Sequence, residues 1–488
     1  MTQSSVEPRT SAEDAGSGSR TPAGRSWLDR YFHISERGST VATEVRGGVT
    51  TFMAMAYILL LNPLILSGKD VDGNLLGQPA LITATALAAA ATTLLMGFWG
   101  KVPLALAAGL SVSGVMASQV VPVMTWPQAM GMSVAYGAVI CLLVVTGLRE
   151  MIMNAIPLAL KHAITIGIGL FIAIIGFVKA GFVHENPAPG GGPVSLGPAG
   201  ELQGWPVLIF AVTLLLIFAL QARNIPGAIL IGIVVGTVVA VVLNAIADIP
   251  AKAWFSGPPE LHGSAVSAPD FSLFGQVSFS GWGDVGYITI TMIVFTLVLA
   301  GFFDAMATIL GVGTEAKLAD DKGRMPGLSK ALFIDGAGGV IGGGAGASGQ
   351  TVFVESATGV GEGARTGLAS VVTGGFFALC LFFTPLTAIV PQEVAAAALV
   401  VIGSMMMQNA KHVDWSDRSV AIPVFLTVVL MPFTYTITTG VAAGVISYAV
   451  IKTAQGKARE VGAFMWGLTA IFVVYFAIHP IESWLGVG

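Results

Sequence analysis

Three acidic residues lie within or beside apolar segments in the second half of the chain: Asp304, Asp335 and Glu355. A carboxylate inside a membrane is costly, so such residues generally face a cavity and carry a function. Asp304 and Thr308 are four residues apart and share one face of a helix. This placement makes Asp304 a candidate proton carrier. Asp335 is equally a candidate for a structural cap and for proton coupling.

Glu355 is the acid most directly placed to bind a ligand. It follows a β-favouring run at 350–354, which includes Thr351, and it opens a short helical segment. The N-terminal dipole of a helix favours an ionised acid, and the N–H groups of the first turn can donate to a ligand. We therefore expect Glu355 to stay ionised and to accept hydrogen bonds from a substrate.

Aromatic rings near these acids can hold a planar ligand by stacking. Phe353 lies two residues before Glu355, on the same face if the run is an extended strand. Phe303 and Tyr57 belong to other segments that would line the same site. Most aromatic residues in membrane segments serve packing, so no single ring identifies the site.

A glycine-rich stretch precedes the β-favouring run. Eight of the fourteen residues at 336–349 are glycine, which weakens a helix and permits close backbone approach. An interrupted segment among apolar spans is tolerated only where it lines a cavity or is buried in protein. With a carboxylate, it indicates the substrate site of a transporter. The alternative is a re-entrant packing loop whose acid has no function.

The composition is that of a polytopic membrane protein. Hydrophobic residues make up 54% of the 488 positions and charged residues only 10%, against about 25% in soluble domains. The mean hydropathy is +0.81. A net charge of −4 argues against a nucleic-acid partner. Cys141 and Cys380 lie in apolar runs, and the six histidines lack metal-ligand spacing, so no disulfide, metal or cofactor is expected.

The polar N-terminal residues 1–45 predict a cytoplasmic tail rather than a signal peptide, because residues 1–25 contain no apolar core. Within that tail, 26–45 mixes aromatic and charged residues. This pattern fits either an amphipathic helix on the inner membrane surface or a plain linker.

Fourteen apolar segments are long enough to be membrane spans or interrupted spans, and they fall into two sets of seven separated by a polar loop at 247–284. The first set is 47–66, 79–98, 103–121, 127–146, 158–180, 205–220 and 226–246. The second set is 285–310, 328–341, 345–360, 366–385, 394–407, 420–435 and 437–451.

The loop charges give these spans an orientation. Lysine and arginine gather in alternate loops, and placing the N-terminus inside puts those loops in the cytoplasm and the loop at 247–284 outside. Seven is odd, so two tandem halves (46–246 and 285–453) must cross the membrane in opposite directions, as in the inverted repeats of transporters. The apolar run at 464–478, within the C-terminal segment 454–488, is either a fifteenth span or an interfacial helix.

Several motifs resemble those of AzgA-like purine permeases, of the nucleobase–cation symporter (xanthine/uracil permease) superfamily. The resemblance begins with FHISERGSTVATEVRGGVTTFMAMAY at 32–57 and continues through KHAITIGIGLFIAIIG at 161–176. It extends through FFDAMATILGV at 302–312, FVESATGV at 353–360 and AIPVFLTVVLMPFTYTI at 421–437. It covers nearly the whole chain from 31 to 452.

The resemblance implies an all-α, fourteen-span inverted repeat of the uracil-permease type, with short β-strands in spans three and ten. It divides each half into a core (46–147 and 285–387) and a gate (158–246 and 391–453). It implies proton-coupled import through an elevator-like motion, in a plasma-membrane protein that is usually a homodimer. By position, Asp304 and Glu355 match the family's acids on spans eight and ten. Thr308 matches the residue one turn beyond Asp304, and Phe353 the aromatic beside the base.

One departure concerns span three, which in this family typically reads Pro-Gly-Met-Gly-Leu-Asn. Here 108–113 read Ala-Gly-Leu-Ser-Val-Ser. Ser113 stands at the amide position and can still bond a substrate, with fewer donors and acceptors, so the preferred purine stays open.

The sequence thus predicts a proton-coupled importer of adenine, guanine or hypoxanthine, and not an enzyme. The alternatives are an anion carrier of the related sulfate-permease type and a channel. Two carboxylates at the site would repel an anion.

Overall fold

A computed structural model describes residues 26–148, 156–186, 194–197, 200–254, 257–260, 264–318, 325 and 327–485. The predicted tail therefore lies outside the described residues up to position 25. The described chain is mostly helical, as expected, and each of the fourteen predicted segments falls on a helix or on a strand followed by a short helix.

The elements of the first half keep close to the predicted bounds. They are α2 (Val41–Met55), α3 (Ile58–Ile65), α4 (Gln78–Leu95), β1 (Leu106–Ala108), α5 (Leu110–Val115), α6 (Trp126–Val145), α8 (Leu158–Lys179), α9 (Trp205–Ala222) and α10 (Ala228–Ala247). A small hairpin, β2 (Val183–Glu185) with β3 (Val194–Leu196), follows α8.

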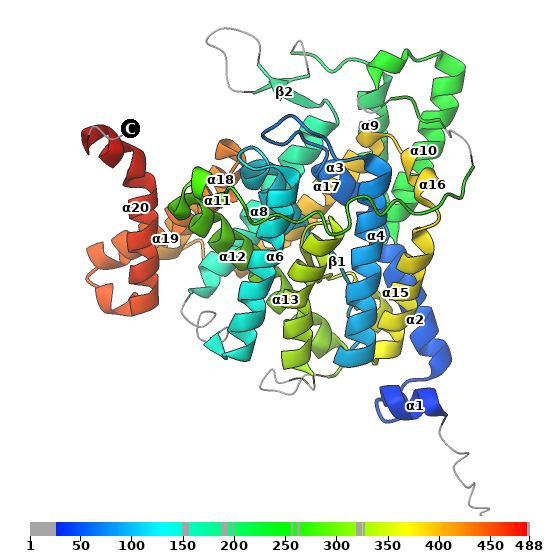
Figure 1. The fold of residues 1–488 in the computed structure, drawn as a ribbon, viewed down its shortest axis with the longest axis horizontal. Helices are drawn as coiled ribbons and strands as arrows, with labels where there is room; N and C mark the ends of the chain where they lie inside the picture. Colours follow the sequence, from blue (N-terminus) through cyan, green and yellow to red (C-terminus); the bar gives the residue numbers. More distant parts are fainter. Residues whose placement is uncertain are drawn as a thin grey trace, which may run out of the picture.

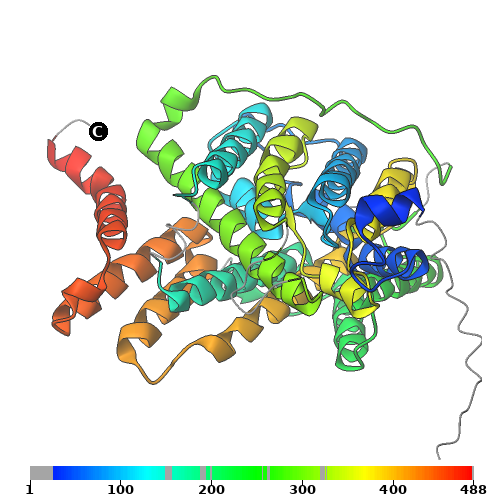
Figure 2. The ribbon, with the colours of Figure 1, turned by 90° about the horizontal axis from the view of Figure 1, so that it is seen from below.

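The second half repeats this order of elements. They are α12 (Tyr287–Glu315), α13 (Leu328–Ala345), β4 (Gln350–Val352), α14 (Ser356–Gly361), α15 (Gly367–Cys380), α16 (Thr384–Ala388), α17 (Gln392–Met406), α18 (Arg418–Thr434) and α19 (Ile437–Ala454). The remaining apolar run forms α20 (Ala463–Leu485), which contacts α19 and α12 and is set apart from the other helices in Figure 2.

Eight helices of the described residues are long and apolar enough to cross a membrane. They are Val41–Ile65, Gln78–Gly100, Trp126–Val145, Leu158–Lys179, Trp205–Ala222, Ala228–Ala247, Gln392–His412 and Ile437–Ala454. Five shorter apolar helices accompany them, including Leu110–Val120 and Ala463–Ala477. The chain is therefore a multi-pass membrane protein.

The helices pack in two groups. In the first, α13 packs on α6 and α4, α15 packs on α2 and α4, and α14 packs on α2. In the second, α17 packs on α8 and α9, and α18 packs on α8 and α19. In Figure 2, α4, α6 and α13 of the first group lie in the upper part of the view and α8 and α18 of the second group lie below them.

The glycine run was expected to interrupt the helix, but α13 continues through it to Ala345. The missing side chains instead let α6 lie against α13. A Cβ on Gly339 would lie 2.6 Å from the Cα of Gly137, and a Cβ on Gly343 would lie 2.7 Å from the carbonyl oxygen of Met130. The helix breaks only at Gly346, whose φ is +85°.

Two segments outside the predicted spans are bound to the first helix group. Residues 264–282 cross the ends of its helices that lie away from the N-terminus (Figure 1), where Gly275 N donates to Gly344 O at 2.8 Å. At the other end, the segment 26–45 forms α1 (Trp27–Phe32) and the start of α2, and Phe32 is buried in a cluster with Leu368.

Strands β1 and β4 form a buried antiparallel pair in which Leu106 lies opposite Val352. Side chains satisfy the backbone groups that point away from the pair. The Thr93 hydroxyl accepts from Leu106 N at 2.9 Å and donates to Leu106 O at 2.8 Å. The Ser356 hydroxyl accepts from Ala105 N at 3.0 Å. The two broken segments therefore hold one another.

Thr93→Val should destabilise the fold, because it keeps the shape of the side chain but leaves two buried backbone groups of Leu106 without this partner. An unsatisfied buried group costs about 1–3 kcal/mol. The expected result is a lower unfolding midpoint of the purified protein in detergent.

Thr92→Val is the matched control. The Thr92 hydroxyl is also buried but donates to Ala88 O and Ala89 O of its own helix, at 2.7 and 3.4 Å. It should shift the midpoint far less. If the two variants lower the unfolding midpoint equally, the hydrogen bonds between Thr93 and β1 do not contribute more to stability than an ordinary bond within a helix.

Candidate functional site

A cavity of about 100 Å³ lies beside the strand pair, between the two helix groups. Six parts of the chain contribute to it. They are Tyr57 before α3, Leu110 and Ser111 of α5, Ile172 of α8, Thr308 of α12, the run Thr351, Val352, Phe353, Val354 and Glu355, and Ile402 and Met406 of α17. Four of the predicted site residues therefore meet here: Thr308, Thr351, Phe353 and Glu355.

Glu355 is half-buried and stands at the N-cap position of α14, as predicted. The Tyr57 hydroxyl donates a hydrogen bond to its Oε1. Tyr57 is only 1% exposed and lies at the break between α2 and α3, which turns its ring toward Phe353, with ring centroids 6.5 Å apart. The Tyr57 hydroxyl thus orients the carboxylate of Glu355, beside the ring of Phe353 in the cavity lining.

The first N–H groups of α14 were expected to donate to a ligand, but in the structure they donate to backbone carbonyls. Those of Ala357 and Thr358 donate to the carbonyls of Val354 and Glu355, both at 2.9 Å. The N–H of Ser356 donates to Phe353 O at 3.1 Å. A tight turn therefore uses these donors, and polar recognition in the cavity falls to side chains.

Asp335 lies behind β4 rather than on the cavity surface. It is 3% exposed, and its Oδ1 accepts hydrogen bonds from the Thr351 hydroxyl at 2.9 Å and from Val352 N at 3.3 Å. The α13 helix carries the carboxylate to this point because its glycines let the strand lie close: a Cβ on Gly338 would be 2.6 Å from Gln350 O. Asp335 thus supports the strand that presents Thr351.

Positions 303 and 304 belong to α12, but the side chains of Phe303 and Asp304 lie outside the described residues. Thr308 of the same helix is half-buried and lines the cavity. Residues four apart share a helix face, so position 304 is one turn from the cavity along α12.

Ser113 is fully buried and does not line the cavity. Its hydroxyl donates to Asn62 Oδ1 at 2.7 Å and contacts the Ser348 hydroxyl at 2.8 Å. This network joins α3, α5 and the turn before β4. Ser111, two residues earlier, lines the cavity instead.

Sequence reasoning missed the apolar wall of the cavity, which consists of Ile172, Ile402 and Met406. These side chains carry no polar chemistry. Ile172 falls within the motif at 161–176, but nothing in that run separates it from its apolar neighbours, and Ile402 and Met406 lie outside the motifs. Their role follows only from the packing of the second helix group against the first.

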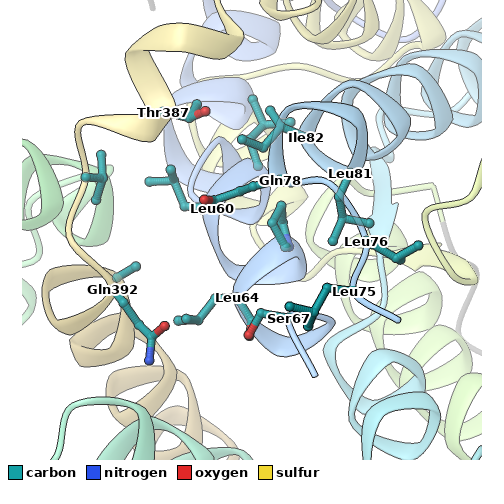
Figure 3. Close-up of a pocket in the computed structure, with 14 residues that line it drawn as sticks. Leu60, Leu64, Ser67, Leu75, Leu76, Gln78, Leu81, Ile82, Thr387 and Gln392 are labelled. Atoms are coloured by element: carbon teal, nitrogen blue, oxygen red, sulfur yellow. The ribbon is translucent and has the colours of Figure 1, made fainter. Parts of the chain in front are cut away.

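A larger cavity of about 200 Å³ lies between α3 and α4 on one side and α16 and α17 on the other (Figure 3). Leucines form much of its lining, and its polar side chains are Ser67, Gln78, Thr387 and Gln392. No acid or aromatic ring lines it, so it lacks the chemistry of the first cavity. Within the described residues there is also no cluster of three or more histidines, cysteines or acids that could hold a metal ion.

Comparison with known proteins gives a consistent assignment. The sequence profile of Xan_ur_permease, described as a permease family, matches residues 42–443. The adenine permease AdeP of Escherichia coli is 35% identical over 93% of this chain and 96% of its own length. The guanine/hypoxanthine permease PbuG of Bacillus subtilis is 36% identical over 92% of this chain and 99% of its own length.

Among solved structures, the transmembrane domain of the cyanobacterial bicarbonate transporter BicA matches with a TM-score of 0.58. The match covers 82% of this chain and 97% of that domain, at 18% sequence identity. At this identity the likeness shows a shared fold alone.

Single cysteines at Thr308 and Ser113 should report which of these residues faces the cavity. In a background without Cys141 and Cys380, Thr308→Cys should react with a small methanethiosulfonate. Ser113→Cys should react at least roughly tenfold more slowly than Thr308→Cys, because a buried site must first open locally. The rates are measured by quenched labelling of membranes and mass spectrometry. Faster labelling at Ser113 would contradict this geometry.

Proposed function

The chain belongs to the permease family, and we propose that it imports purine nucleobases such as adenine, guanine or hypoxanthine. As a permease it is a transporter and not an enzyme. The observation that carries the proposal is the cavity in which Glu355, oriented by Tyr57, lies beside Phe353. Full-length relatives named as adenine and guanine/hypoxanthine permeases support the same substrate class.

The chemistry of the cavity suits a flat, neutral ring with N–H groups on its edge. A carboxylate accepts such N–H groups strongly, because charge-assisted hydrogen bonds are shorter and stronger than neutral ones. The hydroxyls of Ser111 and Thr308 can donate and accept, and the hydroxyl of Thr351, which donates to Asp335, can accept. An apolar wall and an aromatic ring accommodate the ring faces.

We further propose that import is coupled to protons through Asp304. Position 304 lies on α12 one turn before Thr308, which lines the cavity, and an acid beside a substrate path is a candidate proton carrier. Protonation from the outside and release inside would drive accumulation. Asp335, whose Oδ1 accepts the hydrogen bond of Thr351, is the second candidate in the same path.

The proposed architecture is fourteen spans in two inverted halves. Its support is the repeated order of a short strand and a short helix, β1 with α5 and β4 with α14, and the antiparallel pairing of the two strands. The first helix group would act as the moving core and the second as the gate of an elevator. We place the protein in the plasma membrane as a homodimer with a cytoplasmic N-terminus.

Competition for uptake tests the substrate class. Cells or vesicles carrying the protein should accumulate labelled hypoxanthine, and unlabelled purines should inhibit this more strongly than pyrimidines, sulfate or bicarbonate. Inhibition by sulfate or bicarbonate but by no purine would favour an anion carrier and end the nucleobase proposal.

Glu355→Gln should weaken substrate binding. It keeps the size of the side chain but turns one acceptor oxygen into a donor, which then faces an N–H of the base. Such a mismatch costs about 1–3 kcal/mol when buried, or roughly 5- to 150-fold in Kd. Binding to the purified protein measures the effect, and unchanged affinity would remove Glu355 from the site.

Asp304→Asn should separate binding from coupling, because it mimics the protonated acid. Measurable binding and exchange of base are expected, with loss of accumulation driven by an imposed pH gradient in proteoliposomes. Asp335→Asn is the control, with an intermediate effect, since the amide oxygen can still accept from Thr351. Gradient-driven accumulation by Asp304→Asn would refute the assigned role.

A further inference from the structure

The two walls of the cavity differ in what they can discriminate. Hydrogen-bonding groups come from α5, α12 and the segment 351–355, whereas α8 and α17 contribute Ile172, Ile402 and Met406. An apolar wall cannot read donors and acceptors, so it selects ligands by shape alone. The loss or gain of one methylene in such a wall changes selectivity by about 10- to 200-fold.

Met406 is the most adaptable part of this wall. Ile172 and Ile402 are buried, at 0% and 8% exposure, whereas Met406 is half-buried at the last position of α17. A methionine side chain is unbranched and has three rotatable bonds, so it follows the shape of its neighbours. Its place in the cavity therefore depends on where its backbone is held.

Two glycines hold that backbone. A Cβ on Gly169 of α8 would lie 2.6 Å from the Cβ of Met406 and 2.9 Å from the carbonyl oxygen of Gly403. A Cβ on Gly403 would lie 2.4 Å from the carbonyl oxygen of Gly169 and 2.8 Å from the Cβ of Ala173. Real Cβ atoms do not approach so closely, so both positions require glycine for α8 and α17 to meet here.

The same two helices are also fixed farther along. A Cβ on Gly176 would lie 2.8 Å from the carbonyl oxygen of Ala396, so α17 cannot move away from α8 as a whole without losing this contact. A methyl group added at Gly169 must therefore displace the end of α17, and Met406 with it. Ile172 lies three residues after Gly169, so the contact is next to the cavity wall.

We propose that Met406 sets the size limit for the bound base, and that Gly169 and Gly403 position it. Met406 is the specificity-determining side chain, and the glycines act through it. The inference rests on the proposed nucleobase function of the cavity. It adds that discrimination between a bare purine and one with a bulky N-alkyl group is made by the apolar wall rather than by Glu355.

Met406→Ala is the first test. It should raise the affinity for an N6-alkylated adenine relative to that for hypoxanthine about tenfold, read as the ratio of their inhibition constants against uptake of labelled hypoxanthine. If the variant still transports hypoxanthine but excludes the alkylated base as strongly as the wild-type protein does, the inference is wrong. The proposed nucleobase site is not affected by that result. If the wild-type protein bound no purine at all, the proposed function itself would fail, and the inference with it.

Gly169→Ala tests the positioning role, and Gly167→Ala is its matched control on the same helix. A Cβ on Gly167 would meet the flexible Sδ end of Met431 at 2.4 Å, on a side of α8 that does not line the cavity. Gly169→Ala should change the ratio of the KM values for hypoxanthine and the alkylated base, whereas Gly167→Ala should leave that ratio unchanged.

Pairing Gly169→Ala with Met406→Gly removes the closer of the two contacts that the new methyl group makes, the one with the Met406 Cβ at 2.6 Å, and leaves the one with the carbonyl oxygen of Gly403 at 2.9 Å. The double variant should transport hypoxanthine better than Gly169→Ala alone, and it should admit the alkylated base as Met406→Ala does. Equal effects of the alanines at 169 and 167, or no gain from the second substitution, would show that Gly169 does not act through Met406.

Discussion

The structure depends on a short stretch of sheet buried among membrane-spanning helices. Backbone N–H and C=O groups that find no partner in a membrane cost several kcal/mol each. Strands β1 and β4 meet this constraint by pairing with one another and by taking side-chain partners from α4, α13 and α14, at Thr93, Asp335 and Ser356. The sheet thus ties together segments that are far apart in the sequence, and it fixes the residues that follow each strand.

The candidate site is a consequence of that pairing. Once β4 is fixed, the tight turn after it places Phe353 inward and Glu355 at the start of α14, where Tyr57 reaches the carboxylate from the break before α3. The polar side of the cavity is therefore built by the paired segments and their neighbours. The apolar side comes from α8 and α17, which pack with each other more closely than ordinary side chains allow. Recognition of a planar base would combine the two sides.

Much of this organisation is visible in the sequence, because it depends on long-range composition. The apolar segments, the interruptions near 108 and 350, and the acid at Glu355 all follow from spacing and residue type. Which face of a short helix points into the cavity does not follow from spacing and residue type. Ser111 and Ser113 are about 200° apart on a helix of 3.6 residues per turn, and nothing local says which one faces the cavity. The glycine run was also ambiguous, because the same residues that weaken a helix permit the close contact of α13 with α6.

Photoaffinity labelling with 8-azidoadenine would locate the bound base. We expect an adduct in 351–358 or at Tyr57 that excess hypoxanthine prevents, found by peptide mapping of labelled membranes. Hypoxanthine-sensitive labelling confined to the lining of the larger cavity, at Gln78 or Gln392, would contradict the assignment of the site. That result would place the base between α4 and α17, away from Glu355 and from the paired strands.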